Sequence, residues 1–224
     1  MQKTSQIKKI AVVGVMCALA FLCMFVFRFK VMFLTFDVKD AILAIVSLLY
    51  GPIWGIAAAI IVPFLEFLSV SDTGVYGLIM NILSSVTFAF VCGLVYKYKR
   101  SFGGAILAVC LAVVSMVAVM LLANLFVTPY YMHLPRGEVA ALIPTLLLPF
   151  NAIKGVMNAA VTLAIYKPFT TALRRTGLLT RTQHTYRAST KTILLLVISV
   201  VIATLAVVIV LTVLGGNFEL FRSL

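Results

Sequence analysis

Seven long runs of apolar residues constrain this chain more than any other feature. They stand at about 10–27, 41–50, 53–70, 75–96, 103–127, 140–166 and 192–214. A helix needs roughly 20 apolar residues to cross a hydrocarbon core about 30 Å thick, and most of these runs reach or approach that length. Because lipid offers the backbone no hydrogen bonds, such runs must form helices that satisfy their own polar groups. The sequence therefore predicts an all-α fold, a polytopic bundle of membrane helices.

The composition excludes a water-soluble domain. Hydrophobic residues make up 63% of the chain and charged residues only 11%, whereas soluble domains are about half apolar and a quarter charged. The net charge of +12 is typical of some nucleic-acid-binding proteins. Here, however, the 18 Lys and Arg residues cluster at the ends of apolar runs and form no basic stripe. We therefore expect a lipid bilayer around the chain and no nucleic-acid partner.

The N-terminal segment has features of a signal peptide, because Lys3, Lys8 and Lys9 precede the first apolar run. That run is long enough to span a membrane, and no convincing A-x-A cleavage site follows it. We expect it to be the first helix of the mature protein.

The runs at 41–50 and 53–70 meet at Gly51-Pro52, so they form either one bent helix or a tight helical pair. Basic residues near span ends collect on the cytoplasmic side, and this rule favours the pair. With two helices, twelve of the eighteen basic residues lie inside: Lys3, Lys8, Lys9, Lys97, Lys99, Arg100, Lys167, Arg174, Arg175, Arg181, Arg187 and Lys191. The outside then holds Arg28, Lys30, Lys39, Arg136 and Arg222. This arrangement predicts a cytoplasmic N-terminus, seven helices and a C-terminus outside, with a second helix too short to cross unless protein covers its ends.

We expect three segments along the chain. Residues 1–175 form a six-helix membrane domain, residues 176–191 a basic cytoplasmic linker, and residues 192–224 an accessory transmembrane helix with a C-terminal tail. The accessory helix is almost free of polar residues, which separates it from the first six.

Glu66 and Lys154 are the two ionisable residues that this reading places well inside spans. Each would cost at least a few kcal/mol in hydrocarbon unless it is paired or faces water, so both are candidate functional residues. Alternatively, Glu66 lies near the outer end of its helix and reaches the interface. Lys154 is deeper, and snorkelling explains it less well.

Several amides accompany Lys154. Asn151, Lys154 and Asn158 are spaced i, i+3 and i+7, which places them on one helical face. Asn81 and Asn124 stand near the outer ends of their helices at comparable depth. We predict that these residues, with Glu66, line a pocket open to the outside. The alternative for Asn81 and Asn158 is that their amides join neighbouring helices by hydrogen bonds.

A seam of small residues runs along the first helix at Ala11, Gly14 and Ala18. Such a seam lets another helix approach closely, either within this chain or from a partner protein.

Motifs for chemistry are absent from the sequence. It contains no G-x-x-x-x-G-K-[ST], HExxH or GxSxG motif, and none of its four cysteines stands in a CxxC pair. We expect a protein that is not an enzyme, that cannot use ATP by itself, and that holds no metal or cofactor.

Four segments resemble a known family. They are FLTFDVKDAILAI at 33–45, YGPIWG at 50–55, NLFVTPYYM at 124–132 and LPFNAIKG at 148–155. Together they resemble the substrate-binding S components of energy-coupling-factor (ECF) vitamin transporters, and most of all the riboflavin-binding branch, over residues 8–175.

The resemblance implies a six-helix S component of the cell membrane of a bacterium. It would capture a vitamin from outside and dock on a transmembrane T component driven by two ATPases. It assigns Ala11, Gly14 and Ala18 to docking, and Asn124, Asn151 and Lys154 to the flavin. Amides and a lysine suit the donors and acceptors of a flavin's pyrimidine edge.

Other functions remain open at this point. Glu66 stands where flavin-binding members usually carry a Lys-Asn pair, and a carboxylate suits an amine-bearing ligand. The ligand would then be another vitamin or a nucleobase-like precursor, such as a queuosine precursor, thiamine or pantothenate. A structural membrane protein and a membrane-embedded enzyme are the alternatives from other classes.

Overall fold

The computed structural model describes residues 2–31, 33–71 and 73–176. Its helices are α1 (Gln2–Val26), α2 (Lys39–Tyr50), α3 (Pro52–Ser69), α4 (Gly74–Tyr98), α5 (Phe102–Met132), α6 (Arg136–Leu142), the π-helical turn η1 (Ile143–Leu147) and α7 (Leu148–Arg175). A short antiparallel hairpin of β1 (Phe29–Val31) and β2 (Leu34–Phe36) follows α1. Since α6, η1 and α7 follow one another without a gap, they act as one long helix, and the described residues form six helices in all.

The described part of the chain is a membrane bundle. Five of its helical stretches are long and apolar enough to cross a bilayer: Gln6–Val26, Pro52–Ser69, Gly74–Tyr98, Phe102–Met132 and Arg136–Leu173. The predicted helical bundle is confirmed. The expected linker and seventh helix fall on residues 177–224, outside the described residues.

The α2 helix is the centre of the bundle. Its 12 residues make a rod of only about 18 Å at 1.5 Å per residue, too short to span. All ten residues from Lys39 to Leu48 are buried, and α1, α3, α4 and α7 surround them. As predicted, protein covers the short second helix.

The predicted tight pair is confirmed at Gly51, where α2 ends and α3 begins. Gly51 has a φ of 96°, a backbone conformation that residues other than glycine rarely adopt. Pro52 then starts α3 at a position where a backbone N–H has no helical partner. The two helices therefore turn back on each other without a connecting loop.

The hydrophobic core has three parts, and α2 contributes to the first two. The first lies between α1, α2 and α3, and the second between α2, α4 and α5 with α7. The third packs Phe36 of the hairpin against Phe150 of α7, with ring centroids 4.7 Å apart. This third part fixes the hairpin on the bundle.

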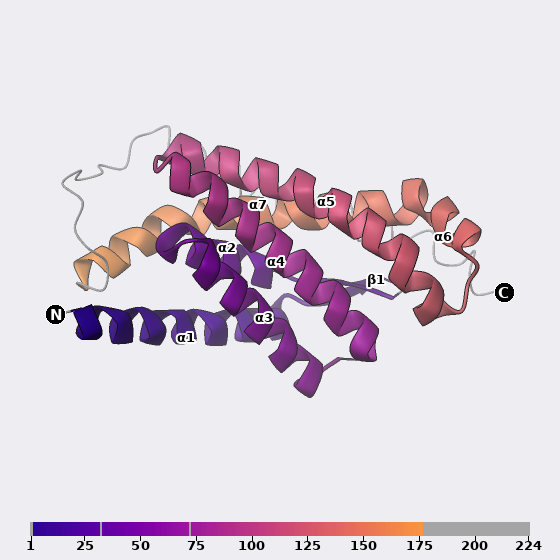
Figure 1. Cartoon of the computed structure of the whole chain (residues 1–224), viewed down its shortest axis with the longest axis horizontal. Helices are drawn as coiled ribbons and strands as arrows, with labels where there is room; N and C mark the ends of the chain where they lie inside the picture. The colour runs from indigo at the N-terminus through magenta and orange to yellow at the C-terminus, as the bar shows by residue number, and fades with distance from the viewer. Residues whose placement is uncertain (1, 32, 72, 177–224) are drawn as a thin grey trace.

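The two ends of the bundle differ in charge. Figure 1 shows that the N-terminal end of α1, the α4–α5 turn and the C-terminal end of α7 gather at one end, while the hairpin and α6 lie at the other. Basic residues described at the first end are Lys8, Lys9, Lys97, Lys99, Arg100, Lys167 and Arg175. Within the described residues, the basic segments that the charge rule assigns to one side therefore lie together.

Candidate functional site

A cavity opens at the end of the bundle that carries the hairpin. It lies between the hairpin, the first half of α4, the second half of α5 and the start of α7. The space free of atoms is about 650 Å³, its open mouth included. The lining residues are Phe33, Leu34, Thr35, Thr73, Tyr76, Gly77, Met80, Asn81, Ser84, Met120, Asn124, Val127, Thr128, Tyr131, Phe150, Asn151 and Lys154.

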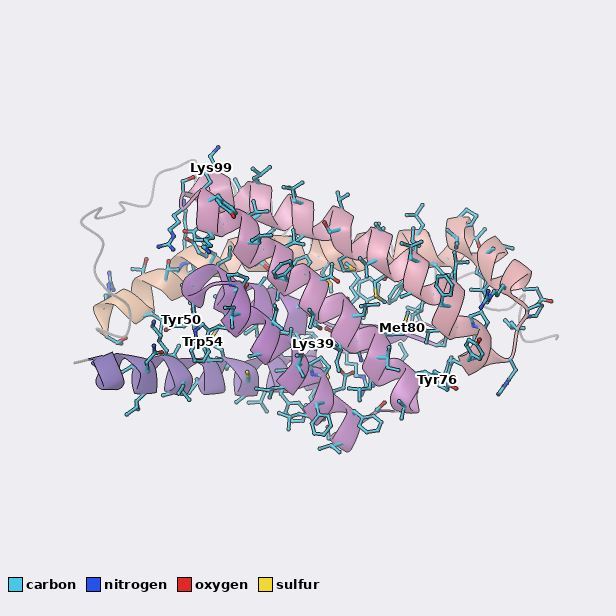
Figure 2. All side chains as sticks on the ribbon, in the orientation of Figure 1. Lys39, Tyr50, Trp54, Tyr76, Met80 and Lys99 are labelled. Atoms are coloured by element: carbon cyan, nitrogen blue, oxygen red, sulfur yellow. The ribbon has the colours of Figure 1, made fainter. Side chains whose placement is uncertain are left out.

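The upper walls of the cavity are aromatic and apolar. Tyr131 of α5 lies between Phe33 of the hairpin and Tyr76 of α4, with ring centroids 6.3 Å away on each side. Figure 2 shows Tyr76 and Met80 on the part of α4 nearest this end. Such walls suit a flat, largely apolar ring system.

Lys154 carries the charge at the cavity floor. Its side chain is only 6% exposed, and its Nζ donates to the backbone oxygen of Thr35 at 3.2 Å and to Asp37 Oδ2 at 3.0 Å. An ammonium group has three N–H donors, so one remains after these two bonds. Since Lys154 lines the cavity, this donor is available to a ligand.

Asn151 and Asn124 are held by their own helices. The Nδ2 of Asn151 donates to the carbonyl of Leu147, the last residue of the π-helical turn, at 2.7 Å. Asn124 donates to the carbonyl of Met120 at 2.7 Å and accepts from Thr128 at 2.8 Å. Each amide keeps hydrogen-bonding capacity after these contacts, and their orientations are fixed before any ligand arrives.

Asn81 joins the cavity from α4. Its Oδ1 accepts from Lys39 Nζ at 3.4 Å, which turns its Nδ2 donors away from that lysine. The structure thus brings four of the six predicted site residues, Asn81, Asn124, Asn151 and Lys154, to one cavity. Their part in ligand binding stays a prediction.

Two of the predicted residues do not line the cavity. The Asn158 amide accepts from the N–H of Ala41 at 2.8 Å and donates to the carbonyls of Asp37 and Lys154, each at 3.0 Å. It therefore ties α7 to the start of α2, which is the alternative that sequence analysis left open. N–H groups in the first turn of a helix lack a partner within the helix, and the amide gives the Ala41 N–H a shorter bond than the 3.3 Å one to the Val38 carbonyl.

Glu66 forms ion pairs instead of facing the cavity. Its carboxylate lies 3.0 Å from Lys39 Nζ and 4.0 Å from Arg28 Nη2. The side chain is 3% exposed, so the idea that it reaches the membrane interface is wrong. Its partner in the bundle is Lys39.

The assignment of Lys39 to an outer loop is also wrong. Lys39 is fully buried at the start of α2, in the middle of the bundle (Figure 2), and its Nζ lies 2.9 Å from Asp37 Oδ2. Asp37 and Asp40 are buried as well, the latter accepting from Ser85 Oγ. Glu66 and Lys154 are therefore not the only ionisable residues inside the protein.

A signal for these residues was present in the sequence. Three of the six acidic residues of the chain are Asp37, Asp40 and Glu66, and all three are buried. In an acid-poor chain, the sequence Asp-Val-Lys-Asp at the start of a short apolar helix indicates a buried group of charges that compensate one another. The rule that basic residues collect on the cytoplasmic side does not reveal this group, because it treats Lys39 as a loop charge.

The small-residue seam faces outward. Ala11, Gly14 and Ala18 are exposed, whereas Met16 and Ala20 on the opposite face of α1 are buried. A Cβ added to Gly14 would meet no atom within 4 Å. The alternative in which this seam packs inside the described part of the chain is therefore wrong.

Comparison with known proteins agrees with this geometry. The family described as "ECF transporter, substrate-specific component" matches residues 8–166. The "Riboflavin transporter RibU" of Staphylococcus aureus (strain TCH60) is 29% identical over 181 residues, which cover 76% of this chain and 94% of the relative. The "Riboflavin transporter FmnP" of Bacillus subtilis (strain 168) is 29% identical over 168 residues, covering 70% and 88%.

A solved structure matches at the level of the fold. It is described as "Structure and mechanism of the S component of a bacterial ECF transporter". The TM-score is 0.63 with 26% sequence identity, over 78% of this chain and 100% of the solved one. The match therefore extends over the whole length of that S component.

Proposed function

Because this chain belongs to the family of substrate-specific components of ECF transporters, a family of membrane proteins that bind vitamins, we propose that it binds riboflavin in the cavity at the hairpin end. In this proposal the flavin's polar pyrimidine edge meets Asn124, Asn151 and Lys154. Its apolar ring edge meets the aromatic walls.

One observation carries the proposal: a single cavity combines fixed polar groups at its floor with aromatic walls above. The third N–H of Lys154 offers a donor, and the side-chain oxygen of Asn151 makes no hydrogen bond within the described residues, which leaves an acceptor beside it. A flavin's pyrimidine edge alternates carbonyl acceptors with an N–H donor and so complements this pair. The two riboflavin transporters similar to this chain support the same ligand.

The structure removes the reason to expect an amine-bearing ligand. That expectation depended on a free carboxylate at Glu66, and that carboxylate pairs with Lys39 and Arg28 outside the cavity. Recognition of a cation would require an acidic group on the wall, and none of the residues described as lining the cavity is acidic.

Uptake requires partners in this proposal. The chain captures the vitamin and docks on a T component with two ATPase subunits, with no cofactor of its own. The exposed seam of Ala11, Gly14 and Ala18 is the proposed contact, because small residues let two helices approach closely in lipid. The basic end faces the cytoplasm, so that the N-terminus lies inside and the cavity opens outside.

Riboflavin binding to the purified protein tests the proposal. Riboflavin fluorescence should be quenched on titration, and Lys154→Met should weaken the affinity by about 1.5–3 kcal/mol, the scale of a hydrogen bond to a charged group. Asn124→Ala and Asn151→Ala should also weaken it. Lys99→Met is the matched control, because Lys99 is exposed at the opposite end of the bundle (Figure 2).

Two results would contradict the proposal. The first is an absence of riboflavin binding at micromolar concentration by folded wild-type protein, with no flavin in native mass spectra of the freshly purified chain. The second is an unchanged affinity in all three cavity variants. In liposomes, uptake by this chain alone, driven by ATP or an ion gradient, would show that no energising partner is needed.

A further inference from the structure

We infer that Asp37, which lies outside the cavity, positions Lys154 for the ligand. The inference rests on the proposed function and adds a residue to it. Asp37 is fully buried and is not among the lining residues, so it acts through Lys154 and touches no ligand.

The geometry places Asp37 between two lysines from distant parts of the chain. A single oxygen, Oδ2, lies 3.0 Å from Lys154 Nζ and 2.9 Å from Lys39 Nζ. The other oxygen accepts from the backbone N–H of Lys39 at 3.2 Å. Both carboxylate oxygens are therefore committed, and the carboxylate has little freedom to rotate.

The backbone of Asp37 is fixed as well. Asn158, one turn beyond Lys154 on α7, donates to the carbonyl of Asp37 at 3.0 Å. The same amide accepts from Ala41 at the start of α2. Asp37 therefore holds Lys154 from a rigid point that α7 itself helps to define.

Positioning matters for lysine in particular. A lysine side chain has several rotatable bonds and loses much rotamer freedom when it is ordered. Asp37 and the Thr35 carbonyl together occupy two of the three N–H donors of Lys154. The remaining donor has a defined direction before the ligand binds, and preorganisation of this kind raises affinity.

Charge balance gives Asp37 a second effect. The carboxylate offsets the positive charge of Lys154 at the cavity floor, where solvent is largely excluded. The floor then offers a hydrogen-bond donor without excess charge, which suits an uncharged carbonyl. Lys39 shares this carboxylate, and Glu66 supplies a second negative charge to Lys39 from the other side.

A double-mutant cycle on riboflavin affinity tests the inference. Asp37→Asn keeps the shape and removes the charge, and we expect its dissociation constant to rise about tenfold, equal to about 1.4 kcal/mol. In a Lys154→Met background the same change should alter affinity by less than about twofold, because the group that Asp37 positions is gone. Asp40→Asn is the matched control, since this buried carboxylate accepts from Ser85, and its affinity should stay within about twofold of wild type.

Two further measurements keep the test decisive if a variant folds poorly or riboflavin is the wrong ligand. Asp37→Asn/Lys39→Met removes one charge of each sign, so it keeps the net charge while still depriving Lys154 of its carboxylate. Apparent melting temperatures without riboflavin report the Asp37–Lys154 coupling independently of any ligand.

The outcomes separate the two ideas. Additive effects of Asp37→Asn and Lys154→Met on riboflavin affinity, or an unchanged affinity in Asp37→Asn, would overturn the inference while leaving the proposed function intact. Wild-type protein that binds no riboflavin contradicts the proposed function; additive melting shifts in the ligand-free cycle would then overturn the contact on which the inference stands.

Discussion

Replacing Lys39, which does not itself line the cavity, with methionine should destabilise the protein strongly. Lys39 is fully buried and lies 2.9 Å from Asp37 and 3.0 Å from Glu66. Methionine keeps much of the stem volume and removes the charge. Removal of one member of a buried ion pair costs about 3–5 kcal/mol, because the remaining charge loses its compensation.

The size of the effect follows from the partners that remain. Among the described residues, Asp37 keeps Lys154, but Glu66 keeps only Arg28, 4.0 Å away and partly exposed. Most of the cost therefore falls on Glu66. A second change, Glu66→Gln, removes this uncompensated charge and should restore at least about half of the lost stability.

Thermal unfolding in detergent measures both steps. For a chain of this size, 1 kcal/mol shifts the melting temperature by about 2–4 °C, so Lys39→Met should lower it by about 6–20 °C. Lys99 is exposed at the basic end of the bundle, so Lys99→Met should change the melting temperature by less than about 2 °C. The reasoning is refuted if Lys39→Met melts within about 2 °C of wild type, or if Lys39→Met/Glu66→Gln is as unstable as the two single effects added together.

Three further predictions concern the helix contacts. Gly14→Leu or Ala18→Leu should abolish uptake by the assembled transporter and spare riboflavin binding, since both residues are exposed; equal loss of binding in a fluorescence titration would contradict this. Gly93→Ala should cost about 1–3 kcal/mol, because its Cβ would press on Ser47 and on the backbone of Pro52. Gly103→Ala, where a Cβ meets nothing within 4 Å, is the control, and equal melting temperatures for the two variants would count against the close α2–α4 contact. Asn158→Leu should cost about 1–3 kcal/mol, because it removes the amide that bonds the Asp37 carbonyl and leaves the Ala41 N–H only its longer, 3.3 Å bond to the Val38 carbonyl; a melting temperature equal to that of wild type would argue that water or another group replaces the amide.

Much of the bundle could be predicted because lipid imposes simple rules. Apolar length located the helices, and the charge rule separated α2 from α3 at Gly51, where the turn requires a positive φ. The floor of the cavity followed from residues that lipid would exclude, above all Lys154. These inferences need only the residue and its place along one helix.

The ion pairs could not be predicted in this way, because they join segments far apart in the sequence. Lys39 meets Glu66 of α3, and Asp37 meets Lys154 of α7 across 117 residues. The sequence alone does not define the register between these helices, so it predicts Lys39 among the loop charges and Glu66 in the cavity. The contact of Asn158 could not be predicted for the same reason. Asn158 shares a helical face with Lys154, but its amide accepts a hydrogen bond from Ala41 of α2.

The buried charges also explain why the cavity lies where it does. Apolar packing alone leaves helices in lipid free to slide, because one apolar surface resembles another, whereas a misplaced ion pair costs several kcal/mol per uncompensated ion. Here Asp37 and Lys39 fix the start of α2 to α3 and α7, and the adjoining Thr35 carbonyl fixes the hairpin to Lys154. The floor of the cavity and the register of the bundle thus depend on the same contacts. A change that loosens the bundle at these charges must also displace the Lys154 donor, so substitution of Asp37 should lower stability and riboflavin affinity together. Substitution of Gly93 should lower stability alone, because a Cβ there would contact Ser47 and Pro52, and neither residue lines the cavity.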